Sequence, residues 1–224
     1  MIPVTDDLQR AKLRVFILAS LPFFLNDFGN MAVTTFKQFI IFDYIAVKAI
    51  PLAILGWALR QGTISLADLG FKRLPLGRMI WLTALLSCLS VAMDQLGAPL
   101  LERFLPSLRL AFVPWDNTSP LFVLDCFVGV ALVALCEETI FRGLACTVLK
   151  DRFKSPVAFY LATSVTFGLI HWSLGLPAVL NAAIIGGLFM PVMVRTGSVW
   201  PQIAAHFLVD FVFFCKCLVV GPCV

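Results

Sequence analysis

Two adjacent glutamates and an arginine stand within one of the most apolar parts of this chain, at Glu137, Glu138 and Arg142. A charged side chain at membrane depth is costly unless it finds a partner or a water-filled cavity, so such residues are candidates for a functional site. Glu138 and Arg142 are four residues apart and share a helix face, so we expect them to pair. Glu137 lies about 140° away from Arg142 on a helical wheel. It is therefore free to meet a group from another helix.

The two histidines of the chain, His171 and His206, also stand in apolar stretches. Asp210 follows His206 by four residues and can orient its imidazole. A buried carboxylate beside a neutral imidazole can deprotonate a water molecule, and a second donor at the same depth can stabilise an oxyanion. This set predicts amide hydrolysis inside a membrane. Polar residues that only join helices, or that serve transport or a proton relay, are the alternatives.

The composition predicts a membrane protein. The chain has 224 residues, of which 60% are hydrophobic and 13% are charged. A soluble domain of this length has too little interior for so many apolar side chains, so lipid is the expected solvent. The net charge is only +4, and no basic run alternates with aromatic residues. We therefore expect no nucleic-acid partner.

We expect an all-α, polytopic transmembrane helix bundle of about seven spans, because apolar windows of about 20 residues recur along the chain. The windows are 14–34, 38–59, 79–99, 120–148, 157–173, 176–194 and 198–220. Asn26, Asp27 and Asn30 interrupt the first window, which makes it the weakest of the seven. We expect one integral membrane domain, in which residues 1–119 form the N-terminal helices and residues 120–220, which hold the candidate site residues, form the catalytic bundle.

The distribution of basic residues predicts a cytoplasmic N-terminus. Eleven Lys and Arg fall in the segments on the N-terminal side of the membrane, against four on the opposite side. One connection on the N-terminal side, 62–77, is expected to be an amphipathic turn on the inner surface, with Lys72 and Arg73 toward lipid headgroups.

The expected spans bring three polar residues to similar depths. At the helical rise per residue, Glu137 lies about 20 Å, His171 about 21 Å and His206 about 16 Å from the inner end of its helix. We therefore expect these residues to share one site, with His171 as the partner of Glu137.

Three motifs in the C-terminal half resemble those of a known family. Glu137-Glu138-x-x-x-Arg142 resembles its EExxxR motif, Phe167-x-x-x-His171 its FxxxH motif, and His206-x-x-x-Asp210 its final HxxxN/D motif. The family is CPBP, which comprises the type II CAAX prenyl endopeptidases and their bacterial relatives, also called abortive-infection proteins. The resemblance covers residues 120–213, and the N-terminal spans carry no diagnostic residue.

The resemblance implies a metal-independent, glutamic-type intramembrane protease without a cofactor. By analogy, Glu137 and His171 activate the water, His206 and Asp210 form the oxyanion hole, and Glu138 and Arg142 position the substrate or the site. The substrate would be a membrane-associated protein or peptide, and whether it is prenylated stays open. The implied location is a bacterial inner membrane. The sequence predicts no oligomeric state.

Four alternatives remain at this point. A zinc protease would need ligands from the same glutamates and histidines, but no HExxH pair exists. A thiol mechanism through Cys136 is disfavoured, because neighbouring acids oppose thiolate formation. A non-catalytic scaffold, such as a bacteriocin-immunity or regulatory protein of the same fold, would use the polar cluster for recognition. A transporter could use the other acids in or near spans, but the chain lacks repeat symmetry.

Overall fold

The computed structural model describes the backbone of residues 6–220 and the side chains of residues 6–216. Within them the chain folds into seven helical stretches without a β-strand, and the expected all-α membrane bundle is confirmed. The first three stretches are α1 (Asp6–Asn30), α2 (Phe36–Asp43) continued by η1 (Tyr44–Ala49) and α3 (Ile50–Arg60), and α4 (Leu76–Ala92) continued by η2 (Met93–Gly97) and α5 (Ala98–Phe104).

The fourth stretch is continuous from Pro120 to Arg152 and changes helix type several times. It consists of α6 (Pro120–Leu124), η3 (Asp125–Gly129), α7 (Val130–Glu138), η4 (Thr139–Leu144), α8 (Ala145–Leu149) and η5 (Lys150–Arg152). The last three stretches are α9 (Pro156–Leu169), α10 (Leu176–Thr196) and α11 (Trp200–Val220), with η6 (Trp172–Leu174) between α9 and α10. η1 to η4 are π-helical, and η5 and η6 are 3-10 turns.

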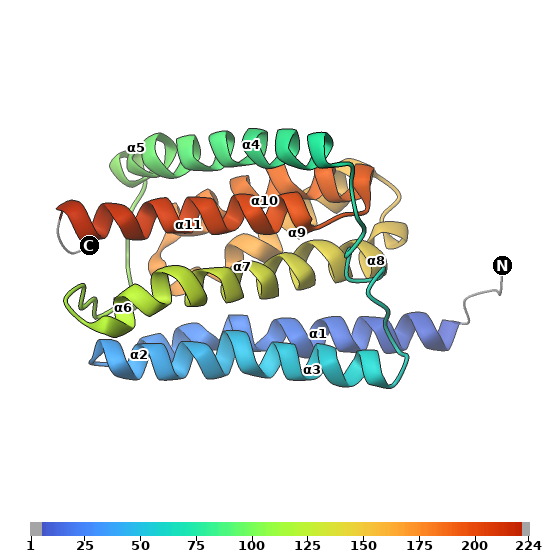
Figure 1. The fold of residues 1–224 in the computed structure, drawn as a ribbon, viewed down its shortest axis with the longest axis horizontal. Coiled ribbons are helices and arrows are strands. Elements are labelled where there is room, and N and C mark those ends of the chain that lie inside the picture. Colours follow the sequence, from blue (N-terminus) through green and yellow to red (C-terminus); the bar gives the residue numbers. More distant parts are fainter. Residues whose placement is uncertain (1–5, 221–224) are drawn as a thin grey trace.

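The helical stretches lie side by side along the long axis of the molecule (Figure 1). The connection 61–75 lies at the end where α1 begins, and the connection 105–119 lies at the opposite end (Figure 1). We call these the N-terminal end and the far end. Successive stretches therefore alternate in direction, as the expected topology requires.

Four of the described helices are long and apolar enough to cross a membrane by length and composition. They are Phe36–Arg60, Leu76–Phe104, Pro120–Arg152 and Leu176–Thr196. α1 carries the polar residues Asn26, Asp27 and Asn30 and is not among them. α9 is apolar but has only 14 residues.

The π-helical segments bring charged residues together. Lys48 lies five residues after Asp43, and its ammonium group forms an ion pair with the Asp43 carboxylate. In a π-helix each backbone N–H bonds to the carbonyl five residues earlier. Residues five apart therefore share a face, and η1 places these two side chains side by side. The two charges thus neutralise each other within the bundle.

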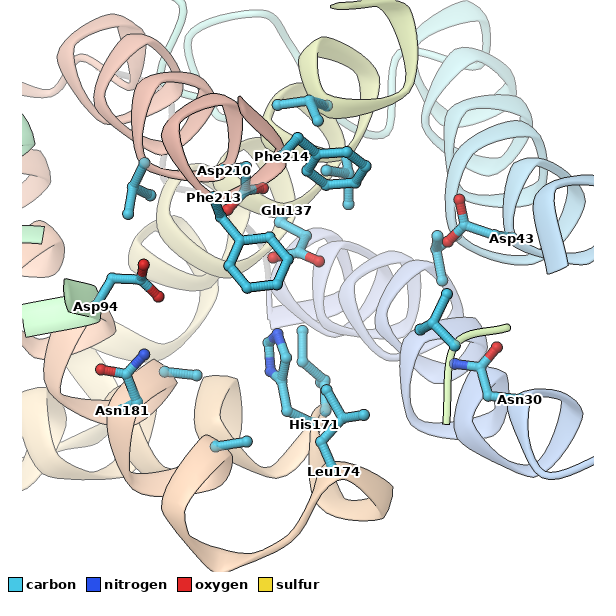
Figure 2. A pocket seen from close by; sticks show the side chains of 18 of the residues that line it. Asn30, Asp43, Asp94, Glu137, His171, Leu174, Asn181, Asp210, Phe213 and Phe214 are labelled. Atoms are coloured by element: carbon cyan, nitrogen blue, oxygen red, sulfur yellow. The ribbon is translucent and has the colours of Figure 1, made fainter. Parts of the chain in front are cut away.

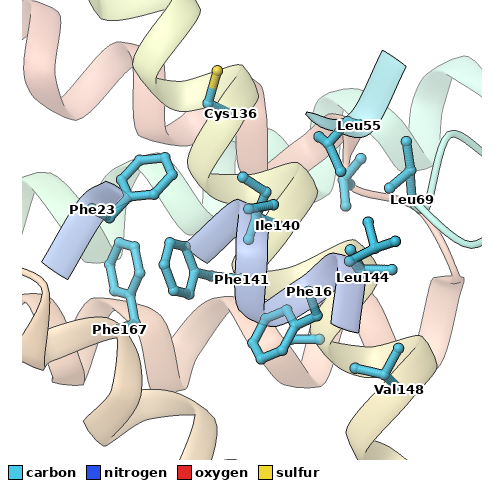
Figure 3. Close-up of a cluster of buried hydrophobic side chains, with 14 of the residues drawn as sticks. Phe16, Phe23, Leu55, Leu69, Cys136, Ile140, Phe141, Leu144, Val148 and Phe167 are labelled. Carbon is cyan, nitrogen blue, oxygen red and sulfur yellow. The ribbon is translucent and has the colours of Figure 1, made fainter. Parts of the chain in front are cut away.

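The main hydrophobic core lies between α1, the fourth stretch and α9. Phe141 is its centre and makes edge-to-face contacts with Phe16, Phe23 and Phe167 (Figure 3). Ring centroids in these pairs are 6.5, 5.3 and 5.7 Å apart, respectively, within the favourable range for aromatic pairs. This core fills the bundle on the N-terminal side of Glu137.

The connection 61–75, which the sequence predicted as a turn over 62–77, packs into the bundle as well as lying on its surface. Leu69 is buried, and a Cβ on Gly143 would lie 2.1 Å from the Leu69 carbonyl oxygen, so this close approach requires a glycine. Phe71 forms an isolated β-bridge with Ser198. Lys72 and Arg73 remain exposed. The connection thus closes the N-terminal end of the bundle.

Candidate active site

A cavity of about 700 Å³ lies within the bundle, and four of the six predicted site residues line it. Glu137 from α7, His206 and Asp210 from α11, and His171 from the turn after α9 all contribute to its wall (Figure 2). Glu137, His171 and His206, which the sequence placed at similar depths, thus line one cavity. Arg142 and Glu138 lie behind this wall and are almost completely buried.

Glu138 makes two polar contacts with neighbouring side chains. One carboxylate oxygen, Oε2, lies 3.1 Å from Arg142 Nε. The other, Oε1, lies 2.8 Å from His206 Nδ1. The expected Glu138–Arg142 pair is confirmed, whereas the contact with His206 was not predicted. Glu138 therefore joins the fourth stretch to α11.

The opposite ring nitrogen of His206 faces two other carboxylates. His206 Nε2 lies 3.3 Å from Asp210 Oδ2 and 3.8 Å from Glu137 Oε2. The first contact is the one expected between Asp210 and the imidazole. Since carboxylate oxygens lie near both nitrogens, only the doubly protonated ring can donate to both sides.

The expected partnership of Glu137 with His171 takes a different form. In the described structure no hydrogen bond joins them, and the histidine nearest to the Glu137 carboxylate is His206. His171 faces Glu137 across the cavity (Figure 2), and its Nδ1 has no hydrogen-bond partner. The two residues therefore border a common space instead of forming a pair.

His171 also lies outside a regular helix, unlike the prediction of a span over 157–173. α9 ends at Leu169, and the chain turns through η6 to α10. Gly175 has a φ of 95°, a conformation that favours glycine, and completes the turn. Irregular backbone at membrane depth is tolerated where protein covers it or where it lines a cavity. This turn meets both conditions.

Residues from distant parts of the chain hold the turn in place. The buried Asp27 carboxylate accepts a hydrogen bond of 2.8 Å from the Ser173 backbone N–H. The Ser173 carbonyl accepts bonds from the N–H groups of Leu110 and Ala111, and Trp172 Nε1 donates to the Phe24 carbonyl. Asp27 is thus a positioning residue for His171. Its charge in an apolar helix marked it, but the sequence offered no means of finding its partner.

Comparison with known proteins agrees with the motifs. Residues 119–212 match the family model described as Rce1-like, type II CAAX prenyl endopeptidase. The similarity to this family thus lies in the C-terminal half of the chain, the half that carries the three motifs. No curated protein and no solved structure matched the chain. The matched residues contain all six predicted site residues.

Phe167 of the Rce1-like region has a larger part in the site than its apolar character indicated. The Arg142 guanidinium carbon lies 3.7 Å from the centroid of the Phe167 ring, a cation–π contact. The same ring meets His171 and His206 edge-on, with centroids 5.6 and 6.4 Å away. A Cβ on Gly186 would lie 3.1 Å from this ring. Phe167 therefore separates Arg142 from the cavity and positions both histidines.

Cys136 lies in the core of the protein, with none of its surface exposed. Its sulfur lies 3.9 Å from the Lys48 carbonyl oxygen, and the side chain packs among apolar groups near Ile140 (Figure 3). We expect Cys136→Ala to retain hydrolytic activity within about twofold, because the removed sulfur does not face the reacting groups. Cleavage by the purified variant checks this. A hundredfold loss with unchanged folding would instead support a thiol mechanism.

Proposed function

We propose that this protein is an intramembrane endopeptidase that hydrolyses a membrane-associated protein or peptide with a water molecule activated by Glu137. One observation carries the proposal. Of the two adjacent glutamates, Glu138 contacts Arg142 and His206 and does not line the cavity, whereas Glu137 lines the cavity and its carboxylate lies 3.8 Å from His206 Nε2. Glu137 is therefore the carboxylate available to a water molecule.

In the proposed reaction, a water between Glu137 and His171 attacks the carbonyl carbon of the peptide bond. Glu137 takes one proton from the water as the new C–O bond forms. The carbonyl oxygen then carries a negative charge, which imidazole N–H donors stabilise. When the C–N bond breaks, Glu137 returns its proton to the leaving amine nitrogen. The products are a carboxylic acid and an amine, and no other reactant is consumed.

The other site residues set the geometry and charge of this reaction. His206 is fixed at one nitrogen by Glu138 and presents its other nitrogen between Glu137 and Asp210. It supplies positive charge beside the attacking water. An ionised Asp210 cannot donate a hydrogen bond to an oxyanion, so we assign it the orientation of His206. His171, which lines the cavity opposite Glu137, is the better oxyanion donor.

The second candidate function is a membrane scaffold or immunity protein of the same fold, in which the polar cluster serves recognition. A comparison of cells that express the native protein with cells that express Glu137→Gln distinguishes the two functions. We expect new N-termini in the membrane proteome only with the native protein. Their sequences would identify the substrate, and the mass of the cleaved fragments would show whether it is prenylated. An identical set of N-termini in both cells would favour the scaffold.

A zinc mechanism predicts a different response to metal removal. Among the described residues, no group of three or more His, Cys, Asp or Glu side chains is arranged to hold a metal ion. We expect the purified protein to keep its cleavage rate within about twofold after exhaustive chelation, because Glu137 and the histidines suffice for the proposed chemistry. Loss of cleavage on chelation, with recovery on adding Zn²⁺, would establish zinc catalysis in its place.

A further inference from the structure

One polar side chain stands on the face that α10 turns toward the cavity. The residues of this face recur at helical spacing and are Pro177, Ala178, Asn181, Ala182 and Ile185. α10 is long and apolar enough to cross a membrane, and a polar side chain in such a helix marks a candidate functional site. Asn181 is that side chain, and it belongs to none of the three sequence motifs.

Helix packing does not account for this asparagine. Polar side chains that join membrane helices do so through hydrogen bonds across the interface, whereas Asn181 Oδ1 is buried and has no such partner among the described residues. α10 meets α9 through the adjacent face instead. A Cβ on Gly168 would lie 2.4 Å from the Val179 carbonyl oxygen and 2.8 Å from Ala183 Cβ. The glycine permits this close contact, and the Asn181 amide remains available to a ligand.

The position of Asn181 points to the reacting carbonyl group. Gly168, which contacts α10 on both sides of Asn181, precedes His171 by three residues, so Asn181 and His171 lie at neighbouring levels. Figure 2 shows both of them below Glu137 in this view, with the amide nitrogen of Asn181 turned toward the interior of the cavity. A water held by Glu137 attacks the carbonyl carbon from its own side. The carbonyl oxygen can then lie toward the donors opposite.

Resting on the proposed function, we propose that Asn181 is a further catalytic residue, whose amide N–H donates a hydrogen bond to the carbonyl oxygen of the scissile peptide bond. With His171 it would form a two-donor oxyanion hole. Negative charge develops on this oxygen as the water adds to the carbonyl carbon, and a donor already in place stabilises it. The charge is lost again when the C–N bond breaks and the carbonyl re-forms. Unlike an imidazole, an amide keeps its N–H donors beside carboxylates such as Asp94 and Asp210.

Replacing Asn181 by Leu tests this assignment, because leucine has a similar size, no donor and a high preference for apolar helices. The purified full-length variants are assayed on a peptide that spans a cleavage site found in the membrane proteome. We expect kcat of Asn181→Leu to fall by roughly 10²–10³-fold, the usual cost of removing one oxyanion donor. KM should change by less than about threefold, because the bond strengthens only in the transition state. Asn181→Ser, which keeps a shorter donor, should cleave at least about tenfold faster than Asn181→Leu.

Two analogues of the same peptide distinguish this role from a purely structural one. In the first, a phosphinate replaces the scissile group and places charged oxygens on a tetrahedral phosphorus. In the second, a CH₂–NH group replaces it and no oxygen is present. We expect Asn181→Leu to bind the phosphinate at least about 10²-fold more weakly and to bind the second analogue within about threefold of the native affinity. Equal weakening for both analogues would show that Asn181 only shapes the cavity, and would overturn the assignment.

Asn30 provides a matched control. Its Oδ1 also lacks a hydrogen-bond partner and it also lines the cavity, but it lies on α1, on the same side as Asp43 and away from His171 (Figure 2). Asn30→Leu should keep kcat within about threefold. A native kcat for Asn181→Leu, with or without a higher KM, would overturn the inference while the loss of cleavage in Glu137→Gln upheld the proposed function. Absence of cleavage by the native protein would overturn the proposed function itself.

Discussion

Replacing Glu137 by Gln is expected to lower the rate of peptide-bond hydrolysis by roughly 10²–10⁴-fold, the usual contribution of a positioned general base. The amide keeps the size and much of the hydrogen bonding of the carboxylate, but it cannot accept a proton from water. Glu137 lies at the cavity wall and its Oε2 has no hydrogen-bond partner, so we expect little loss of stability.

A matched control is available within the same cavity. Glu102 also lines it, but its carboxylate is paired with Arg109 near the surface. Glu102→Gln should therefore retain cleavage within a few-fold. Initial rates of the two purified variants, measured on a peptide spanning a cleavage site found in the membrane proteome, make the comparison. Equal rates for Glu137→Gln and the native protein would remove Glu137 from the mechanism.

Replacing Glu138 by Gln is expected to destabilise the protein by about 3–5 kcal/mol, because it leaves a buried guanidinium without its anionic partner. Arg142 is 1% exposed, and its remaining nitrogens, Nη1 and Nη2, already lack hydrogen-bond partners. The same change weakens the hydrogen bond between position 138 and His206 Nδ1. By the usual relation between stability and melting temperature, the unfolding midpoint in detergent should fall by roughly 6–20 °C.

The comparison for this variant is an ion pair with the same spacing in the chain. Asp6 and Arg10 are also four residues apart, and their side chains are 92% and 66% exposed. Asp6→Asn should leave the unfolding midpoint unchanged, because solvent screens such a pair. If Glu138→Gln unfolds at the same temperature as Asp6→Asn, the buried pair contributes nothing to stability and its proposed structural role is wrong.

The helical stretches could be predicted from hydropathy because lipid imposes one simple requirement on every span. Each of the seven expected windows overlaps one helical stretch of the structure. The depths of Glu137, His171 and His206 also followed from counting residues, since the helical rise is nearly constant. That count was enough to place the three residues at one cavity.

The contacts within the site could not be predicted in the same way. Which glutamate meets His206 depends on how α7 and α11 are rotated against each other, and a helical wheel describes only one helix at a time. The π-helical turn that begins at Thr139 further alters the angles after Glu138. The turn that carries His171 depends on Asp27, which is 144 residues away in the chain. Tertiary packing decides such contacts.

The division of work between Glu137 and Glu138 makes activity and folding separable during evolution. A descendant that lost Glu137 would give up hydrolysis yet keep the buried contacts among Glu138, Arg142 and His206. Such a protein could persist as an inactive receptor for the peptides that its ancestor cut. A descendant that lost Glu138 would not fold as readily, since Arg142 and His206 would lose their buried partner and would have to change as well. Inactive homologues of this fold should therefore vary at the first glutamate of the pair and retain the second.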